Sequence, residues 1–115
     1  MKISKHFSRH EFECSDGCGF DTVDVATLKI LEAIRTHFNA PLEVTSGARC
    51  VEYNASIGGA ENSQHTYGRA ADIQVSNVSP KDVYDWVALN FPFVSLGSYA
   101  TFTHVDTRTD GPARW

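Results

Sequence analysis

One stretch of helical periodicity constrains the fold more than any other feature of this sequence. From about Thr22 to Phe38, apolar residues recur at steps of three and four, which predicts a helix with one buried face. The residues that form this face are Val25, Leu28, Leu31, Ile34 and Phe38. A helix of this kind has to bury its apolar stripe against other elements, so a sheet is expected beside it.

The middle of the chain supplies two candidate strands. Pro41 ends the first helix, and the segment LEVTS over residues 42–46 alternates as a short strand. Residues 52–68 are rich in Gly, Asn and Ser, which predicts a long loop or an irregular turn. The segment AADIQV over residues 70–75 follows as a second strand.

The last third of the chain predicts a second helix and two more strands. Ser79 and Pro80 form a helix start, and this helix ends before Pro92. The segment VSLGSYATFTHVDTR then predicts two short strands joined near Ala100. The whole pattern is an α+β fold with two main helices against a small, mainly antiparallel sheet, and we expect one domain over residues 1–115.

Composition excludes several classes of protein. The chain has 115 residues, with 42% hydrophobic residues, 21% charged residues and a formal net charge of -4. These values are typical of a globular domain, and the absence of a Lys/Arg cluster argues against nucleic acid as a partner. Neither a signal peptide nor a membrane span is recognisable, so we expect synthesis in the cytoplasm and action outside the cell only after release. We expect a monomer.

The chain has three cysteines, Cys14, Cys18 and Cys50. They are too few for a disulfide framework and odd in number. Cys14 and Cys18 flank the residues SDG and suit part of a small metal knuckle, but the sequence offers no clear fourth ligand. A disulfide between Cys50 and one of the other two is an alternative, and free thiols are the interpretation that we favour.

Strand alternation brings a carboxylate and an imidazole to the same face of the predicted sheet. In AADIQV, Asp72 faces opposite to Ile73 and Val75, which suit the core. In FTHVD, the same alternation places His104 and Asp106 on one face together with the phenylalanine. If these two strands are neighbours, His104 and Asp72 approach each other.

The loop before Asp72 can deliver His65 to the same place. Two imidazoles and one carboxylate form a catalytic zinc set with water in the fourth position. Such a zinc acts as a Lewis acid and lowers the pKa of its water to about 7. Spacing alone also allows the ordinary alternatives, a surface histidine and an aspartate that caps a turn.

Three segments carry a resemblance to a known family. SQHTYGRAAD resembles the Ser-x-His-x-x-Gly-x-Ala-x-Asp signature of zinc D-alanyl-D-alanine carboxypeptidases and related peptidoglycan peptidases, which share a metal-site fold with the hedgehog signalling domain. VTSGARC resembles the strand of this family that ends in Ser-Gly-x-Arg, and FTHVDTR resembles the region of the last metal ligand. The opening FSRHEFEC is similar to small, often phage-borne members. The matched residues of the first two segments are Ser63, His65, Gly68, Ala70, Asp72, Ser46, Gly47 and Arg49.

The resemblance implies roles for five residues. His65, Asp72 and His104 correspond to the zinc ligands. Arg49 corresponds to a residue that binds the carbonyl or the terminal carboxylate of the substrate, a role that suits its forked donors. Ser63 either hydrogen-bonds near the metal or the substrate, or only caps the loop.

The sequence departs from the family at one position. Relatives commonly place a catalytic Glu or Asp three residues before the last histidine ligand, and this chain has Thr101 there. The nearest carboxylate is Asp106, which can act as the general base. It can instead orient His104, or take the place of His104 as the metal ligand. We favour His104 as the ligand and Asp106 as the base or the orienting group.

The resemblance therefore implies a zinc metallopeptidase that hydrolyses D-amino-acid-containing peptide bonds of bacterial peptidoglycan. The expected partner is the stem peptide, cut either at a terminal D-Ala or within a stem or cross-link. In the expected mechanism Asp106 removes a proton from the zinc-activated water, and Arg49 stabilises the oxyanion together with zinc. The alternative is a non-catalytic zinc-binding domain, or a phage structural domain, of the same fold.

Overall fold

The sheet of this protein has four strands. The computed structural model describes residues 1–115. The strands are β1 (Leu42–Ser46), β2 (Ala70–Val75), β3 (Ser95–Ser98) and β4 (Thr103–Asp106). They lie in the order β1-β2-β4-β3, and each neighbouring pair is antiparallel. The predicted α+β class with a small antiparallel sheet is confirmed.

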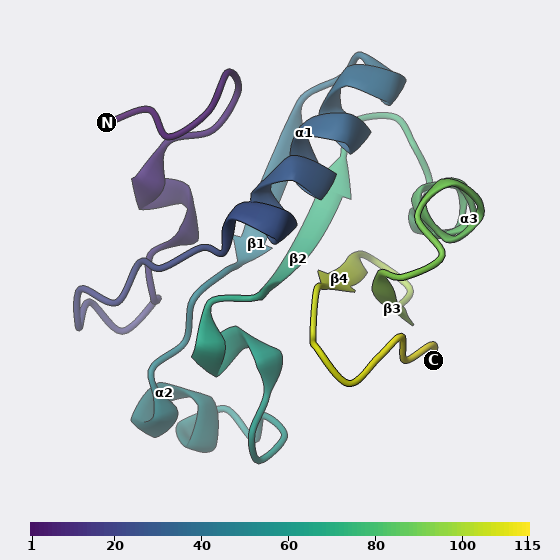
Figure 1. The fold of residues 1–115 in the computed structure, drawn as a ribbon. Coiled ribbons are helices and arrows are strands. Elements are labelled where there is room, and N and C mark those ends of the chain that lie inside the picture. The colour runs from purple at the N-terminus through teal and green to yellow at the C-terminus, as the bar shows by residue number, and fades with distance from the viewer.

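Three α-helices and two short 3-10 helices complete the fold. They are η1 (Arg9–Phe12), α1 (Val25–Phe38), α2 (Val51–Ser56), η2 (Gln64–Tyr67) and α3 (Pro80–Asn90). Figure 1 shows α1 alongside β2, α3 beside β3, and α2 near the end of the sheet where β1 ends and β2 begins. The two predicted main helices are α1 and α3.

The prediction of a long loop over residues 52–68 is wrong in part, because this segment contains most of α2 and all of η2. The polar and glycine residues that predicted a loop mark the ends of these short helices instead. Ser63 caps η2 by accepting a hydrogen bond from the backbone N–H of His65. Gly68 ends η2 in the left-handed conformation, with φ of 70°.

The buried face of α1 differs slightly from the predicted one. Ile30, Leu31 and Ile34 are buried, whereas Val25, the first residue of the helix, is 63% exposed. Ile30 lies one residue before Leu31, and the two together widen the buried stripe beyond the strict three- and four-residue steps. The helix packs onto β2, as its periodicity requires.

The two faces of the sheet have opposite characters. Ala71 of β2 lies opposite Val105 of β4, and both belong to the hydrophobic core together with buried residues of α1 and α3. The next residue pair along the same strands is Asp72 opposite His104. Because side chains alternate across a strand, this polar pair lies on the face that α1 and α3 do not cover.

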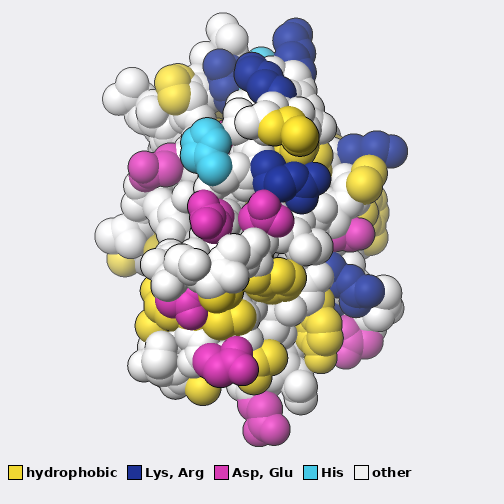
Figure 2. Space-filling view, turned by 90° about the vertical axis from the view of Figure 1, so that its left-hand side faces the viewer, with side chains coloured by type: hydrophobic (Ala, Val, Ile, Leu, Met, Phe, Trp, Pro, Cys, Tyr) yellow, Lys and Arg dark blue, Asp and Glu magenta, His cyan; other side chains and the backbone are white.

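The surface carries charges of both signs. On the face drawn in Figure 2, Lys and Arg side chains lie mainly in the upper half, while Asp and Glu side chains lie in the middle and lower parts. None of the helices combines the length and the apolar composition needed to cross a lipid bilayer.

Candidate metal centre

The pairing of β2 with β4 fixes two of the three predicted metal ligands. Asp72 and His104 are direct partners in the antiparallel register, as the sequence predicted for neighbouring strands. The Nδ1 atom of His104 lies 2.9 Å from Oδ1 of Asp72. Both side chains are buried.

The third side chain comes from η2, which directly precedes β2. His65 is buried, and its Nε2 atom lies 3.3 Å from Oδ1 of Asp72. A tight chain reversal at Gly68 makes this approach possible, since a Cβ atom there would lie 2.7 Å from Cγ2 of Thr22. One ligand atom each from His65, Asp72 and His104 lies within 4.8 Å of the other two.

In each imidazole one ring nitrogen faces Asp72, here called the inner nitrogen, and the other, the outer nitrogen, faces away from it. The contacts of the outer nitrogens show how the rings are protonated. Nδ1 of His65 lies 2.7 Å from the carbonyl oxygen of Gly47, and Nε2 of His104 lies 2.7 Å from Oδ2 of Asp106. A carbonyl and an ionised carboxylate only accept hydrogen bonds, so each of these outer nitrogens donates. The inner nitrogen of a neutral ring then directs a lone pair at Asp72.

Lone pairs of two imidazoles that face one carboxylate repel it, unless the rings take up further protons or a cation lies between them. Two neutral imidazoles, each donating its outer N–H to an acceptor, and one carboxylate are a donor set that zinc takes in proteins. The side chains of His65, Asp72 and His104 therefore fit zinc, the metal that the sequence resemblance implies.

Charges within the cluster shift the pKa values of its members. Burial raises the pKa of Asp72, but when the rings of His104 and His65 carry the further protons, their hydrogen bonds and charges outweigh burial and hold this pKa below its usual range. Burial lowers the pKa of His104, and its contacts with Asp106 and Asp72 outweigh that effect and raise the pKa overall. The cluster as a whole attracts positive charge, either as protons or as a metal ion.

Arg49 reaches the same cluster from the segment after β1. Its Nη2 atom lies 3.3 Å from Oδ2 of Asp72, and its Nε donates to Oγ of Ser46 at 3.0 Å. Its Nη1 donates to the side-chain oxygen of Asn54 at 3.3 Å. These contacts fix the guanidinium beside the candidate ligands, where the sequence predicted a substrate-binding group.

Asp106 lies on the other side of His104 and is completely buried. Its Oδ2 contacts Nε2 of His104 and accepts from Nη2 of Arg108, each at 2.7 Å. Its Oδ1 accepts from Nε of Arg108 at 2.9 Å and from the Arg108 backbone N–H at 3.1 Å. Burial raises the pKa of Asp106, but the Arg108 and His104 contacts outweigh it and hold this pKa below its usual range.

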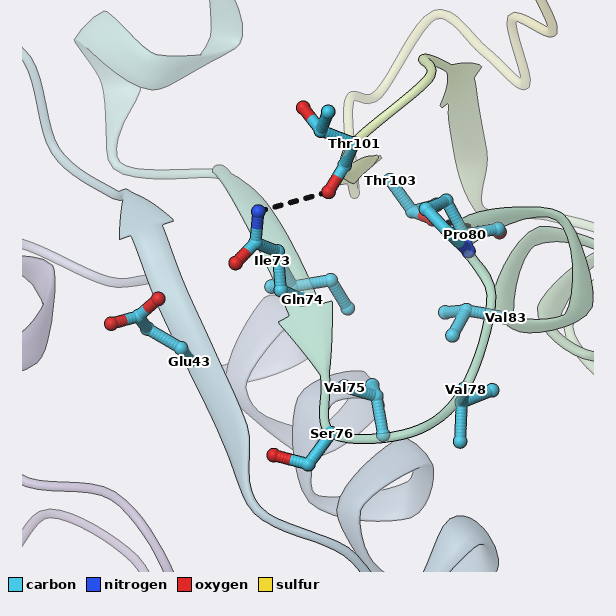
Figure 3. A pocket seen from close by; sticks show the side chains of 10 residues that line it. All are labelled: Glu43, Ile73, Gln74, Val75, Ser76, Val78, Pro80, Val83, Thr101 and Thr103. Carbon is cyan, nitrogen blue, oxygen red and sulfur yellow. Dashed lines mark hydrogen bonds between the residues drawn. The ribbon is translucent and has the colours of Figure 1, made fainter.

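Thr101, which occupies the family's usual acid/base position, lines a different pocket. Figure 3 shows this pocket between the end of β2 and the start of α3, with the carbonyl oxygen of Thr101 accepting from Nε2 of Gln74 at 2.9 Å. None of the predicted metal ligands lines it. Thr101 is therefore both chemically unsuited to proton transfer and placed away from the candidate ligands.

The candidate ligands line a cavity of about 420 Å³, together with Arg49 and Ser63. One wall is aromatic and consists of Tyr99, Phe102 and Trp115. The Trp115 ring centre lies 5.1 Å from that of His104, and its Nε1 donates to the Tyr99 hydroxyl at 2.9 Å. No sequence pattern indicated Tyr99 and Trp115 as site residues, although strand alternation had placed Phe102 on the same face as His104.

These features define a class of protein, an α+β domain whose sheet presents a buried His–Asp–His cluster beside an arginine and an open cavity. The sequence profile of the Peptidase M15 family matches residues 5–106, which is most of the chain. The chain therefore belongs to the Peptidase M15 family. Membership implies a zinc-dependent peptidase, and the buried cluster could bind that metal.

A curated relative is similar over part of its length. The zinc D-Ala-D-Ala carboxypeptidase of Streptomyces albus G is 42% identical over 50 residues, which make up 43% of this chain and 20% of that enzyme. The matched segment thus spans about a fifth of the relative. The match supports a distant homology between this chain and that carboxypeptidase.

Proposed function

We propose that this chain is a zinc peptidase that hydrolyses peptide bonds next to a D-amino acid in bacterial peptidoglycan, with His65, Asp72 and His104 as the metal ligands. The observation that carries the proposal is the orientation of the two imidazoles. Both outer N–H groups are held by acceptors, so both inner nitrogens face one buried carboxylate. Family membership and the named relative support the choice of zinc and of a D-Ala-containing peptide.

Bound at this cluster, zinc would polarise the scissile carbonyl and lower the pKa of a water molecule to about 7. Arg49 supplies a fixed positive charge on the same cavity, suited to the carbonyl oxygen or the terminal carboxylate of the peptide. Ser63 caps η2 and also lines the cavity, so it positions His65 and is available to the substrate. The aromatic wall offers an apolar surface for the alanine methyl groups.

The contacts of Asp106 support the orienting role among the alternatives left open by the sequence. All four hydrogen bonds of its carboxylate go to His104 and Arg108, and none of its surface is exposed to accept a proton from solvent. In this arrangement Asp106 holds the His104 tautomer that directs Nδ1 at the cluster. Its role as the general base remains a prediction.

If Asp106 only orients His104, another group has to take the proton. Glu61 lines the same cavity and is exposed. We propose it as the alternative proton acceptor. The comparison of Glu61→Gln with Asp106→Asn separates the two roles, because loss of a base lowers turnover without releasing zinc, whereas loss of an orienting group weakens zinc binding.

A non-catalytic zinc-binding domain is the second candidate function. The observation in its favour is that the usual acid/base position is Thr101 and that Thr101 lines another pocket. Several properties remain predictions from the sequence. They are phage origin, a monomeric state, a single domain, cytoplasmic synthesis with action on the wall after release, and the lack of a nucleic-acid or membrane partner.

The test is incubation of the zinc-loaded protein with purified peptidoglycan, followed by mass analysis of the released fragments. Free D-Ala would identify a carboxypeptidase, and stem or cross-link pieces would identify an endopeptidase. The zinc-free protein and the His104→Ala variant, treated with zinc in the same way as the wild type, are the controls. Zinc binding without any released product would favour the non-catalytic domain over the enzyme.

A further inference from the structure

A second cluster of potential metal ligands lies away from the His–Asp–His site. The three thiols and the carboxylate of Cys14, Asp16, Cys18 and Cys50 each offer one ligand atom, and these atoms lie within 4.8 Å of one another. The sequence analysis had found no clear fourth ligand for Cys14 and Cys18. The fold supplies two, Asp16 from the same loop and Cys50 from the N-cap of α2.

The distances in this cluster suit a tetrahedral zinc ion. Zinc–sulfur bonds of about 2.3 Å separate two tetrahedral sulfur ligands by about 3.8 Å, and a sulfur from a carboxylate oxygen by roughly 3.5 Å. The Sγ atoms of Cys14 and Cys50 lie 3.9 Å apart. Oδ1 of Asp16 lies 3.2 Å from Sγ of Cys14, and Oδ2 of Asp16 lies 3.2 Å from Sγ of Cys50.

The backbone around the cluster gives independent support. The N–H of Cys50 donates to Sγ of Cys14 at 3.5 Å, and the N–H of Tyr53 donates to Sγ of Cys50 at 3.4 Å. Such backbone donors to sulfur orient the two side chains, as contacts around the ligands do in metal sites. The N–H of Cys18 donates to Oδ1 of Asp16 at 2.9 Å and fixes the carboxylate.

We propose that Cys14, Asp16, Cys18 and Cys50 form a structural zinc site that is separate from the peptidase centre. The four ligands complete the coordination of the metal, which is the arrangement of structural rather than catalytic zinc. The site joins the N-terminal segment to the start of α2, two regions that are far apart in the sequence and lie near each other in Figure 1.

This site would also brace the residues beside the peptidase centre. Cys50 directly follows Arg49, whose backbone N–H donates to the carbonyl of His65 at 3.0 Å. The N–H of Ala48 donates to the carbonyl of Phe12 at 2.8 Å, so the N-terminal segment already contacts this stretch. A metal at the cysteine cluster would hold Arg49 in place from its other side.

The test uses the full chain, reduced and then loaded with Co²⁺ in place of zinc. A cobalt–thiolate site has charge-transfer absorption in the near ultraviolet, which a site of imidazoles and a carboxylate lacks. We expect this absorption in the wild type and, undiminished, in His104→Ala, together with a second equivalent of metal in the wild type. It should therefore persist even if the peptidase centre binds no metal and hydrolyses nothing.

Two kinds of variant keep the proposal falsifiable. The triple variant Cys14→Ser/Cys18→Ser/Cys50→Ser should lose the thiolate absorption. The Asp16→Asn variant should bind cobalt at this site about 10-fold or more weakly than the wild type. The Ser15→Ala variant, in the same loop, is the matched control. Should the triple variant fail to fold, Asp16→Asn carries the comparison. Absence of thiolate absorption in the folded wild type would overturn the proposal, as would a disulfide that removes two of the thiols in the freshly purified protein.

Discussion

The two faces of the β2–β4 pair differ by a single step along each strand. On one face Ala71, Val105 and Ile73 pack into the core under α1 and α3. On the other face Asp72 and His104 meet His65. Because the period of a strand is two residues, a one-residue slip of either strand would exchange these faces and destroy both the core and the cluster. The packing of the apolar face therefore holds the polar face in register.

Removal of a candidate ligand should have the largest effect on function and a small effect on folding. His104→Ala should lose, after dialysis, the zinc equivalent that the His–Asp–His cluster holds, and should reduce hydrolysis to the level of the zinc-free protein. The loss should exceed the roughly 10- to 100-fold that is typical for residues that only support a ligand. Metal analysis and the peptidoglycan assay measure it. A His104→Ala protein with the zinc content and the activity of the wild type would show that the polar face is not the metal centre.

The opposite result is expected on the apolar face. Ile73 is almost completely buried, and Ile73→Ala should lower the free energy of unfolding by about 2–5 kcal/mol. The zinc content of the folded fraction should stay unchanged. Urea unfolding and metal analysis of the same sample test both statements. Loss of zinc from a folded Ile73→Ala protein would show that the two faces are not separable in this way.

Asp106 lies between these two cases, because it is buried yet contacts a candidate ligand. Asp106→Asn can donate to Nε2 of His104 and so favour the wrong tautomer, which should weaken zinc binding about 10- to 100-fold. Added zinc should restore part of the activity. Asp110→Asn, an exposed neighbour, is the matched control. Full zinc affinity with lost turnover would identify Asp106 as the base instead.

The turn that delivers His65 requires a glycine. Gly68 has φ of 70°, and a Cβ atom there would lie 2.8 Å from the carbonyl oxygen of Thr22. Gly68→Ala should lower the free energy of unfolding by about 2 kcal/mol, and His65 should be misplaced. Gly58→Ala is the matched control, since Gly58 has φ of 73° and a Cβ atom there would meet nothing within 4 Å, and it should cost about 1 kcal/mol. Equal unfolding midpoints for Gly68→Ala and Gly58→Ala would show that close packing at Gly68 does not add to the cost of the substitution.

The smallest effect is expected at a site that belongs to neither face. Glu32 of α1 accepts hydrogen bonds from the hydroxyl of Ser4 and the backbone N–H of His6 at 2.5 and 2.7 Å. Burial raises the pKa of Glu32, but these bonds and the His6 ring outweigh burial and lower the pKa overall. A lowered pKa means that the stabilisation is present above the ordinary value of about 4.3 and is lost as the pH falls through the folded-state value.

Urea unfolding of the wild type and Glu32→Gln across this range tests that sign. The wild type should be more stable by about 1 kcal/mol at neutral pH, and the difference should shrink in acid. Glu52→Gln, at an exposed position in α2, should show no such trend. A difference that grows in acid would contradict the assigned direction of the pKa shift.

Local patterns predicted the parts of this molecule that depend on neighbouring residues. The bounds of β1 and the Ser79–Pro80 start of α3 follow from alternation and capping, and strand parity alone placed Asp72 opposite the core. The short helix α2 was not predicted, because a segment of six residues is too short to show a helical period and the glycine and asparagine residues near it indicated a loop. The aromatic wall was missed because backbone hydrogen bonds with the distant residues Leu96 and Ser98 bring Trp115 to the cavity.

The cysteine cluster shows the same limit more clearly. Cys14 and Cys50 lie 36 residues apart, and only the tertiary fold brings their sulfur atoms to 3.9 Å. The contacts of Asp106 with Arg108 were likewise beyond the sequence pattern, which placed Asp106 on the same strand face as His104 and offered the orientation of His104 as one of its alternative roles. Sequence patterns thus supplied the candidate residues, and the packing of distant segments decides among their roles.

The most direct test of the central claim is anomalous diffraction at the zinc edge from crystals of the full chain grown with zinc. The account predicts a peak in bonding contact with Nε2 of His65, the Asp72 carboxylate and Nδ1 of His104. A map with those three side chains ordered and no zinc among them would contradict it.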